Sequence, residues 1–179
     1  IRQTLRDAID RAKAAFHPLA HVSNGGAFAG LYDALEQSSE QSLGLVLDVS
    51  QSQASEDLLE KLHSEGGIHI LVNNAGINDG ISLEHGSYEG FIQSLHNNLV
   101  HYYLIVKAAL PELIKSKGAI VNISSKVAET GQGGTSGYAA SNCGRNALTR
   151  EWAVELLKYG IRVNAVIVAE CFTPLYESW

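Results

Sequence analysis

AIVNI at residues 119–123 and IRVNAVIV at residues 161–168 decide the fold, because a long helical pattern lies between them. Both runs are short, rich in Val and Ile and almost continuously apolar, which is typical of strands covered on both faces. Between them, residues 138–158 carry apolar side chains at helical spacing, ending before Gly160. A strand, a helix and a second strand predict a right-handed βαβ unit with parallel strands.

The same alternation extends toward the N-terminus. Apolar runs at residues 43–49 and 68–72, and a weaker run at residues 19–23, predict further strands. Helical spacing of apolar residues is found at residues 2–15, 26–37, 52–64 and 88–110, the last followed by Pro111. We therefore expect an α/β fold with a three-layer, doubly wound, Rossmann-like parallel sheet.

Length and composition exclude several classes of protein. The 179 residues fit a single domain over residues 1–179, and a hydrophobic content of 45% is ordinary for a globular protein. The net charge of −6 argues against a general nucleic-acid binder, and no apolar stretch is long enough to predict a membrane span. With no secretory signal and only two cysteines, we expect free thiols and a cytoplasmic location.

Ligands of parallel sheets bind beyond the carboxyl ends of the strands, so the residues there carry the functional hypotheses. Asn73-Asn-Ala-Gly76 combines amides with small residues that let a flat ligand approach the backbone; a tight turn is the alternative. Ser125 follows the run at residues 119–123, and Tyr138 opens the next helix. The tyrosine can move a proton while the serine polarises the same substrate oxygen; a helix cap and a core tyrosine are the alternative.

These motifs, in this order, resemble the short-chain dehydrogenase/reductase family. Asn73–Gly76 matches the family's Asn-Asn-Ala-Gly motif, and Asn98 matches its catalytic asparagine. Ser125 and Tyr138 match its catalytic serine and tyrosine, and residues 162–166 match the strand before its nicotinamide loop. The resemblance implies hydride transfer between NAD or NADP and a hydroxyl or carbonyl group, with the tyrosine exchanging the proton. Nothing in the sequence selects NAD over NADP.

The resemblance also implies a set of cofactor-binding residues. Asp48 would receive the adenine amino group, Val49 would cover the adenine ring, and Thr173 would hold the nicotinamide carboxamide. Asn98 would hold a water of the proton relay. The adenosine side would be lined by Asn74, Ala75 and Gly76, and Tyr138 would also contact the cofactor. The structural alternatives are a helix cap for Asp48, a helix kink for Asn98 and a turn for Thr173.

The loops resemble the branch of the family that oxidises free sugars, typified by L-fucose dehydrogenase. Asn78, Gln132 and Glu170 offer the amide and carboxylate groups that a polyhydroxylated substrate needs; solvated loop residues are the alternative. The family counterparts of the helices at 88–110 and 138–158 form a dimer interface, which implies a homodimer or homotetramer. The histidines show no metal-ligand spacing, so we expect no metal.

Position 142 departs from the family pattern. The family carries Tyr-x-x-x-Lys, whereas this chain has Asn142 four residues after Tyr138. The family lysine binds the nicotinamide ribose, and its charge favours the ionised tyrosine, a group that titrates at about 10 when free. Because Asn142 is neutral, we expect severely reduced turnover. The competing hypothesis is an inactive Rossmann-like protein that serves in interaction or oligomerisation.

The two ends of the chain depart from the family as well. The family begins with a strand and a glycine-rich turn for the pyrophosphate, whereas residues 2–15 here already resemble the helix after that turn. That strand is central in the family's sheet, so its absence leaves neighbouring strands with unpaired edges. The family's substrate lid and last strand are absent after Trp179, and we expect a chain truncated at both ends.

Overall fold

The computed structural model describes residues 20–23, 43–46 and 67–169, with side chains for residues 67–169. The chain divides into two compact units after Asp48, and each is described by itself. In the first unit, β1 (Ala20–Ser23) and β2 (Leu43–Val46) pair in parallel. Strands are thus confirmed within two predicted runs, while the helices predicted at 2–15, 26–37 and 52–64 lie outside the described residues.

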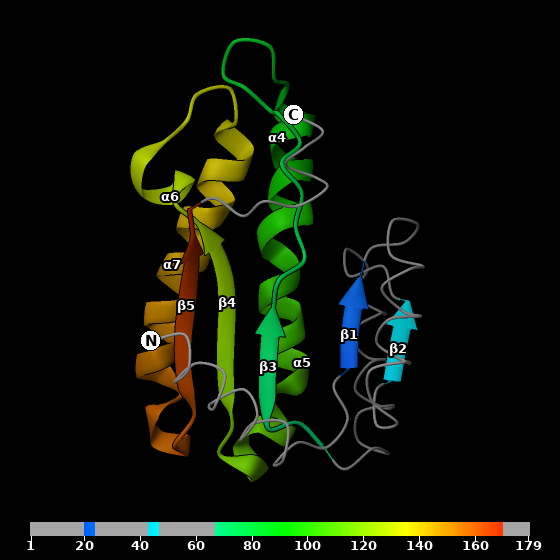
Figure 1. The fold of residues 1–179 in the computed structure, drawn as a ribbon, viewed down its shortest axis with the longest axis vertical. Coiled ribbons are helices and arrows are strands. Elements are labelled where there is room, and N and C mark those ends of the chain that lie inside the picture. The colour runs from blue at the N-terminus through cyan, green and yellow to red at the C-terminus, as the bar shows by residue number, and fades with distance from the viewer. Residues whose placement is uncertain (1–19, 24–42, 47–66, 170–179) are drawn as a thin grey trace, which may run out of the picture. The chain divides into compact units, whose positions relative to one another are not determined.

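The second unit contains a three-stranded parallel sheet in the order β3-β4-β5 (Figure 1). Its strands are β3 (Ile70–Asn73), β4 (Ala119–Ser125) and β5 (Arg162–Val168). All three fall within or beside the predicted runs, and their parallel pairing confirms the Rossmann-like α/β fold. Among the described residues β3 bonds only to β4, and β1 only to β2.

The helical segment predicted at 88–110 differs from the prediction in two ways. It consists of α4 (Tyr88–Leu95), a π turn η1 (His96–Val100) and α5 (His101–Ser116). The chain therefore stays helical past Pro111, although proline removes a backbone donor. The reason is packing: Leu113 is completely buried one half-turn later, and its burial outweighs the lost hydrogen bond.

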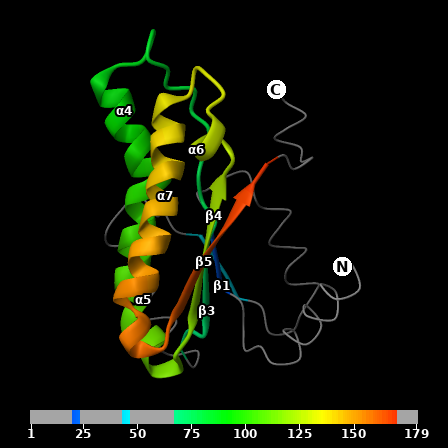
Figure 2. The same cartoon turned by 90° about the vertical axis from the view of Figure 1, so that its left-hand side faces the viewer.

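The helix predicted at 138–158 is confirmed as α7 (Ser136–Glu155), and its last turn tightens into the 3₁₀ segment η2 (Leu157–Tyr159). Gly160 ends it with a φ of 73°, a conformation that favours glycine. A short helix that was not predicted, α6 (Val127–Thr130), follows β4. Figure 2 shows α4, α5 and α7 side by side against one face of the sheet.

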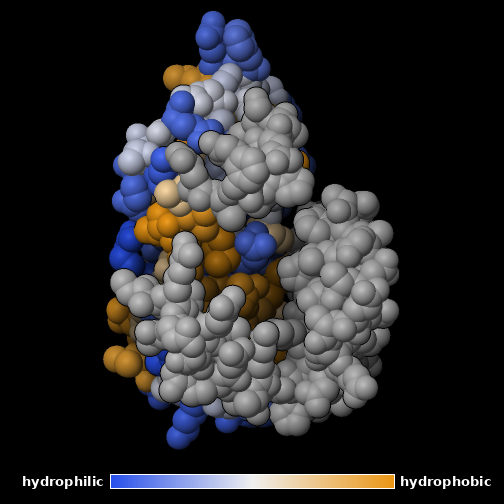
Figure 3. Space-filling model, viewed as in Figure 1, coloured by the Kyte–Doolittle hydropathy of each residue, from blue (hydrophilic) through white to orange (hydrophobic). Residues whose placement is uncertain are grey.

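The apolar core lies between these helices and the sheet. Tyr102, Leu113 and Ile120 are fully buried in it. The remaining buried members of this cluster are Ile68, Val106, Ala109, Trp152, Leu156, Ile161 and Val163. The opposite face of the sheet shows an apolar surface (Figure 3). In β3, Val72 is 52% exposed.

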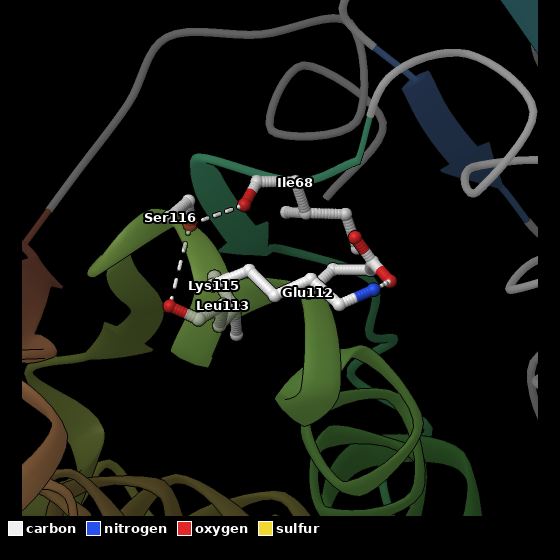
Figure 4. Close-up of polar contacts among 5 residues, drawn as sticks. All are labelled: Ile68, Glu112, Leu113, Lys115 and Ser116. Carbon is white, nitrogen blue, oxygen red and sulfur yellow. Dashed lines mark hydrogen bonds and ion pairs between the residues drawn. The ribbon is translucent and has the colours of Figure 1, made fainter.

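The C-terminal end of α5 is fastened to the segment that leads into β3 (Figure 4). Ser116 Oγ donates its hydrogen bond to the carbonyl of Ile68 at 2.6 Å, and the carbonyl of Leu113, at 3.3 Å, is a second, longer acceptor for the same proton. Beside them, Lys115 pairs with Glu112 at 2.6 Å. These contacts fix the helix at the amino end of the sheet, so its first turns are held at the carboxyl end.

Candidate active site

The carboxyl ends of β3 and β4, the π turn η1 and the start of α7 lie at one end of the sheet (Figure 1). The four predicted catalytic positions come from these elements. They are Asn98 in η1, Ser125 at the end of β4, and Tyr138 and Asn142 in α7. The structure therefore brings to one end of the sheet the elements that the sequence motifs predicted.

Asn98 is fully buried and connects three segments. Its Oδ1 accepts a hydrogen bond from the Ile77 amide at 2.7 Å, and its Nδ2 donates to the Ser94 carbonyl at 3.0 Å. Its own carbonyl accepts from Nε of Arg145 at 2.6 Å. The helix irregularity considered as the alternative for Asn98 is present as the π turn, a feature common at functional sites.

Ser125 and Tyr138 are both half-buried. Ser125 Oγ accepts a hydrogen bond from the Val127 amide at 3.3 Å, a contact within the turn that leads into α6, whose N-cap is Lys126. Its O–H remains a donor for a ligand. The Tyr138 hydroxyl has no hydrogen-bond partner among residues 67–169. That the two hydroxyls converge on one substrate oxygen remains a prediction.

Asn142, at the family's lysine position, is turned inward and fully buried. Its Nδ2 donates to the Tyr138 carbonyl at 2.9 Å, and its Oδ1 accepts from Nη1 of Arg145 at 3.2 Å. Ser124 Oγ donates to the Asn142 carbonyl at 3.2 Å. Both ends of this amide thus bond to the protein, and a role in binding the nicotinamide ribose remains a prediction.

Arg145 is a site residue that the sequence motifs missed. Its side chain is 3% exposed. Besides Asn98 and Asn142, Nη1 donates to the Ile123 carbonyl at 3.2 Å and Nη2 to the Ala75 carbonyl at 3.3 Å. The available signal was a charged residue three positions after Asn142, on the helix face where the pattern calls for burial.

Two neighbours of Arg145 are held in their neutral forms. The Tyr102 ring lies 4.4 Å from the guanidinium carbon, and its hydroxyl donates to the Ile123 carbonyl at 3.0 Å. Burial raises the pKa of Tyr102 to about 12, although the Arg145 charge opposes this. Burial, and then the Arg145 charge, lower the pKa of His101 to about 4. Its Nε2 therefore carries the proton and donates to the Ala75 carbonyl at 3.1 Å.

The predicted cofactor residues after β3 are Asn74, Ala75 and Gly76, and two of these three are small. Asn74 and Gly76 are exposed and Ala75 is half-buried. A Cβ on Gly76 would lie 2.6 Å from Nη2 of Arg145, so only glycine fits at this position without a shift. The exposed amide and the bare backbone suit the adenosine side of a dinucleotide. The predicted contacts Asp48, Val49 and Thr173 lie outside the described residues.

The predicted substrate residues lie in two loops. Asn78 is half-buried and its Oδ1 accepts from the Gly80 amide at 3.4 Å, a contact within its own turn. Gln132 is exposed in the loop between α6 and α7. Glu170 lies outside the described residues. Their role in binding a sugar remains a prediction.

A metal-binding cluster and a membrane-spanning helix are both absent from the described segments. Residues 20–23, 43–46 and 67–169 contain no group of three or more His, Cys, Asp or Glu side chains that could hold a metal ion. In the same residues, no helix is both long enough and apolar enough to cross a membrane.

Comparison with known proteins places the chain in a family. The family model described as short chain dehydrogenase matches residues 8–179. L-fucose dehydrogenase of Mus musculus is 38% identical over 147 residues, which are 81% of this chain and 54% of that protein. The 3-oxoacyl-[acyl-carrier-protein] reductase of Thermotoga maritima is 37% identical over 135 residues, 74% of this chain and 55% of that protein.

Among solved structures, the crystal structure of Cj0485 dehydrogenase has a TM-score of 0.84 and 40% identity. The match covers 89% of this chain and 62% of that one. The chain thus spans about half the length of the curated relatives that it matches. On these grounds, and on the order of its motifs, the chain belongs to the short-chain dehydrogenase family.

Proposed function

We propose that this protein is an NAD- or NADP-dependent oxidoreductase that acts on a hydroxyl or carbonyl group of a sugar or similar small alcohol. The observation that carries the proposal is the placement of Tyr138, whose phenol has no hydrogen-bond partner among the described residues, at the helix start that follows Ser125. Similarity to L-fucose dehydrogenases over 81% of the chain supports the sugar as substrate.

The two hydroxyl groups divide the work on the substrate oxygen. A bound NAD or NADP would supply the hydride acceptor in oxidation. Ser125 would donate a hydrogen bond to the substrate oxygen, and Tyr138 Oη, in its ionised form, would take the proton of the substrate hydroxyl. The C–H electron pair leaves as hydride and the O–H proton goes to the phenolate, so an alcohol becomes a carbonyl. In reduction, Tyr138 would return the proton.

Substrate recognition would fall to the loops around this centre. Asn78 and Gln132 offer amide groups that can bond to sugar hydroxyls, and Glu170 would add a carboxylate. Such a site rejects analogues that lack the hydroxyl, because its polar groups are then left unpaired. We therefore infer a preference for free sugars over simple alcohols.

Asn142 bears on the rate rather than on the class of reaction. It carries no charge, and its amide bonds to the Tyr138 carbonyl and to Arg145. We infer a turnover below that of an enzyme with the family's lysine at this position. The cofactor would also lose one anchor at the nicotinamide ribose.

A panel of aldoses and simple alcohols, assayed with NAD and with NADP by absorbance of the reduced nicotinamide, tests the proposal. We expect turnover with at least one free sugar, and a loss of about 100-fold in kcat for Ser125→Ala. Thr130→Ala, at an exposed hydroxyl on the same connection, is the control and should match the wild type. Turnover of no alcohol or sugar with either cofactor would contradict the proposal.

A second candidate function is an interaction or oligomerisation module without catalysis. It is favoured by apolar side chains on the outer helix faces: Tyr103, Val154 and Leu157 are 49%, 76% and 72% exposed. These residues would support a homodimer or homotetramer through α5 and α7. Light scattering of the Val154→Glu variant tests this association by measuring the molar mass in solution. A decrease to the mass of the monomer, with an unchanged rate of nicotinamide reduction, would show that association and catalysis are separate properties.

A further inference from the structure

Arg145 is a buried cation without a described anionic partner. In the described part of the chain the ion pairs join other residues, and none involves this guanidinium. Burial of an unpaired charge costs several kcal/mol unless other groups compensate it. Three backbone carbonyls and one amide oxygen do so in part, at 2.6 to 3.3 Å.

These contacts leave donor capacity in the site. A guanidinium has five N–H groups, and the described contacts use four of them. The remaining N–H belongs to Nη2, the atom that a Cβ on Gly76 would meet at 2.6 Å. Gly76 is exposed, so this end of the guanidinium lies beside the backbone of residues 74–76, where a ligand would approach.

The position of Arg145 on α7 directs its charge toward Tyr138. The two residues are seven apart, two helical turns, and therefore share a helix face with Asn142 between them. Helical side chains lean toward the N-terminus of their helix, and Nη1 accordingly lies 3.2 Å from Oδ1 of Asn142, one turn nearer to Tyr138. The charge thus occupies the surroundings of position 142, where the family has its lysine.

Two nearby groups are excluded as the missing anion. Tyr102 stacks on the guanidinium, but burial raises its pKa to about 12, so it stays a neutral phenol. His101 is neutral at pH 7 and shares the Ala75 carbonyl with Arg145. Burial lowers the pKa of Arg145, whereas the phenols of Tyr102 and Tyr138 act in the opposite direction. Of those two phenols, Tyr138 is the one to which the proposed function assigns the proton exchange.

We propose that Arg145 supplies the positive charge of this active site and stabilises the ionised Tyr138 in place of the lysine that is absent at position 142. This inference rests on the proposed function. Arg145 acts through Tyr138 and is therefore a positioning residue. Its bonds to the carbonyls of Ala75, Asn98 and Ile123 also hold the ends of β3 and β4 against the π turn.

The first test needs neither substrate nor cofactor. The protein is labelled with 3-fluorotyrosine, the Tyr138 resonance is assigned by its loss in Tyr138→Phe, and its fluorine shift is followed against pH. We expect Arg145→Met to move the midpoint of this transition to higher pH by at least about one pH unit, and Arg145→Lys to restore most of the difference. An unchanged midpoint in folded Arg145→Met would overturn the proposal.

The second test relocates the charge. Arg145→Met should lower kcat by about 100-fold, and Arg145→Lys should retain kcat within about 10-fold of the wild type. The double variant Asn142→Lys with Arg145→Met should regain at least about 10-fold over Arg145→Met, because the cation is again beside Tyr138. If the double variant and Arg145→Lys are both as slow as Arg145→Met, Arg145 has only a structural role.

The two experiments separate failure of this inference from failure of the proposed function. A shifted fluorine midpoint without turnover of any sugar or alcohol would retain the charge assignment and reject the dehydrogenase activity. Turnover that persists in Arg145→Met, with an unshifted fluorine midpoint, would retain the dehydrogenase activity and reject the charge assignment. Circular dichroism and thermal unfolding of each variant establish that the comparison is made between folded proteins.

Discussion

The interface between the sheet and its helices changes character along the strands. At the amino ends it is apolar: Leu113, Ile120, Trp152 and Ile161 are almost completely buried there. From the middle of the strands to their carboxyl ends the same two layers bury polar groups instead. These are Asn73, Ser94, Asn98, His101, Asn122, Ser124, Ser141, Asn142, Arg145, Asn146 and Thr149. One end of the interface resembles an ordinary core, and the other resembles a site.

The apolar and polar parts of this interface contribute differently to stability and to chemistry. Apolar burial contributes about 25 cal/mol for each Å² removed from water and needs no exact geometry. Buried polar groups contribute little net stability, but each must be satisfied, and this fixes a unique arrangement. The chain from Asn73 through Asn122 to Thr149, with both bonds at 2.9 Å, shows such an arrangement. We therefore expect substitutions in the apolar part to act on stability, and those in the polar part to act on activity as well.

The largest loss of stability is expected from Leu113→Ala at the apolar end. Leu113 is fully buried, and its truncation should lower the free energy of unfolding by about 2–5 kcal/mol. Urea denaturation followed by circular dichroism measures this. Leu157→Ala, at a leucine that is 72% exposed, should stay within about 0.5 kcal/mol of the wild type. Equal losses for the two leucines would break the comparison.

His101 gives the polar end a pH dependence. Its pKa is lowered by burial to about 4, below the unfolded value of 6.5, so the unfolded state binds more protons between these values. The resulting stability is present above pH 6.5 and is lost as the pH falls to about 4, by about 3 kcal/mol.

His101→Gln removes this titration and keeps a donor for the Ala75 carbonyl. The decline of unfolding free energy between pH 7 and pH 4 should therefore be smaller in the variant by about 3 kcal/mol. His85→Gln, at a histidine whose side chain is 80% exposed, is the matched control. A decline of the same size in His101→Gln and the wild type would contradict the neutral, buried imidazole.

Asn122→Ala tests the polar chain at the centre of β4. It leaves Asn73 Nδ2 and Thr149 without their contacts to Asn122, and we expect a loss of about 1–3 kcal/mol. Thermal unfolding of Asn122→Ala measures this loss. In the same measurement Asn164→Ala, at an exposed asparagine on the neighbouring strand, should have almost no effect. A neutral Asn122→Ala would mean that this chain of hydrogen bonds does not hold the layers together.

Gly76→Ala should have the smallest effect on stability and a clear effect on activity. Its Cβ would lie 2.6 Å from Nη2 of Arg145 and 3.0 Å from Oδ1 of Asn98, so the guanidinium must move. We expect kcat/KM to fall by about 10-fold, or about 1.4 kcal/mol of transition-state stabilisation. Gly90→Ala, whose Cβ comes no nearer than 3.3 Å to its neighbours, should retain activity. An equal kcat/KM in Gly76→Ala and Gly90→Ala would mean that Gly76 is not part of the active site.

Sequence periodicity and motifs predicted the parallel sheet, its strands and the elements that carry Asn98, Ser125 and Tyr138. They did not predict that the helix continues past Pro111, because burial of Leu113 decides this against the local preference of proline. A helix kink at Asn98 was considered, but its form as a π turn was not predicted, since the hydrogen bonds of Asn98 that accompany it run to segments distant in sequence.

Arg145 shows most clearly what the sequence left open. The family motif has a lysine at position 142, and this chain has a neutral asparagine there. The compensating charge comes from a position outside the motif, and its partners are carbonyls of three segments that meet only in the folded protein. A charged residue in the buried stripe of α7 was visible in the sequence, but its contacts were not.

The central claim is that Tyr138 exchanges a proton with the substrate while hydride leaves the substrate carbon. The most direct measurement is the rate of nicotinamide reduction with L-fucose and related free sugars by the wild type, by Tyr138→Phe and by the control Tyr159→Phe. We expect a loss of at least about 100-fold for Tyr138→Phe alone, with unchanged thermal unfolding. Equal rates for Tyr138→Phe and the wild type would contradict it.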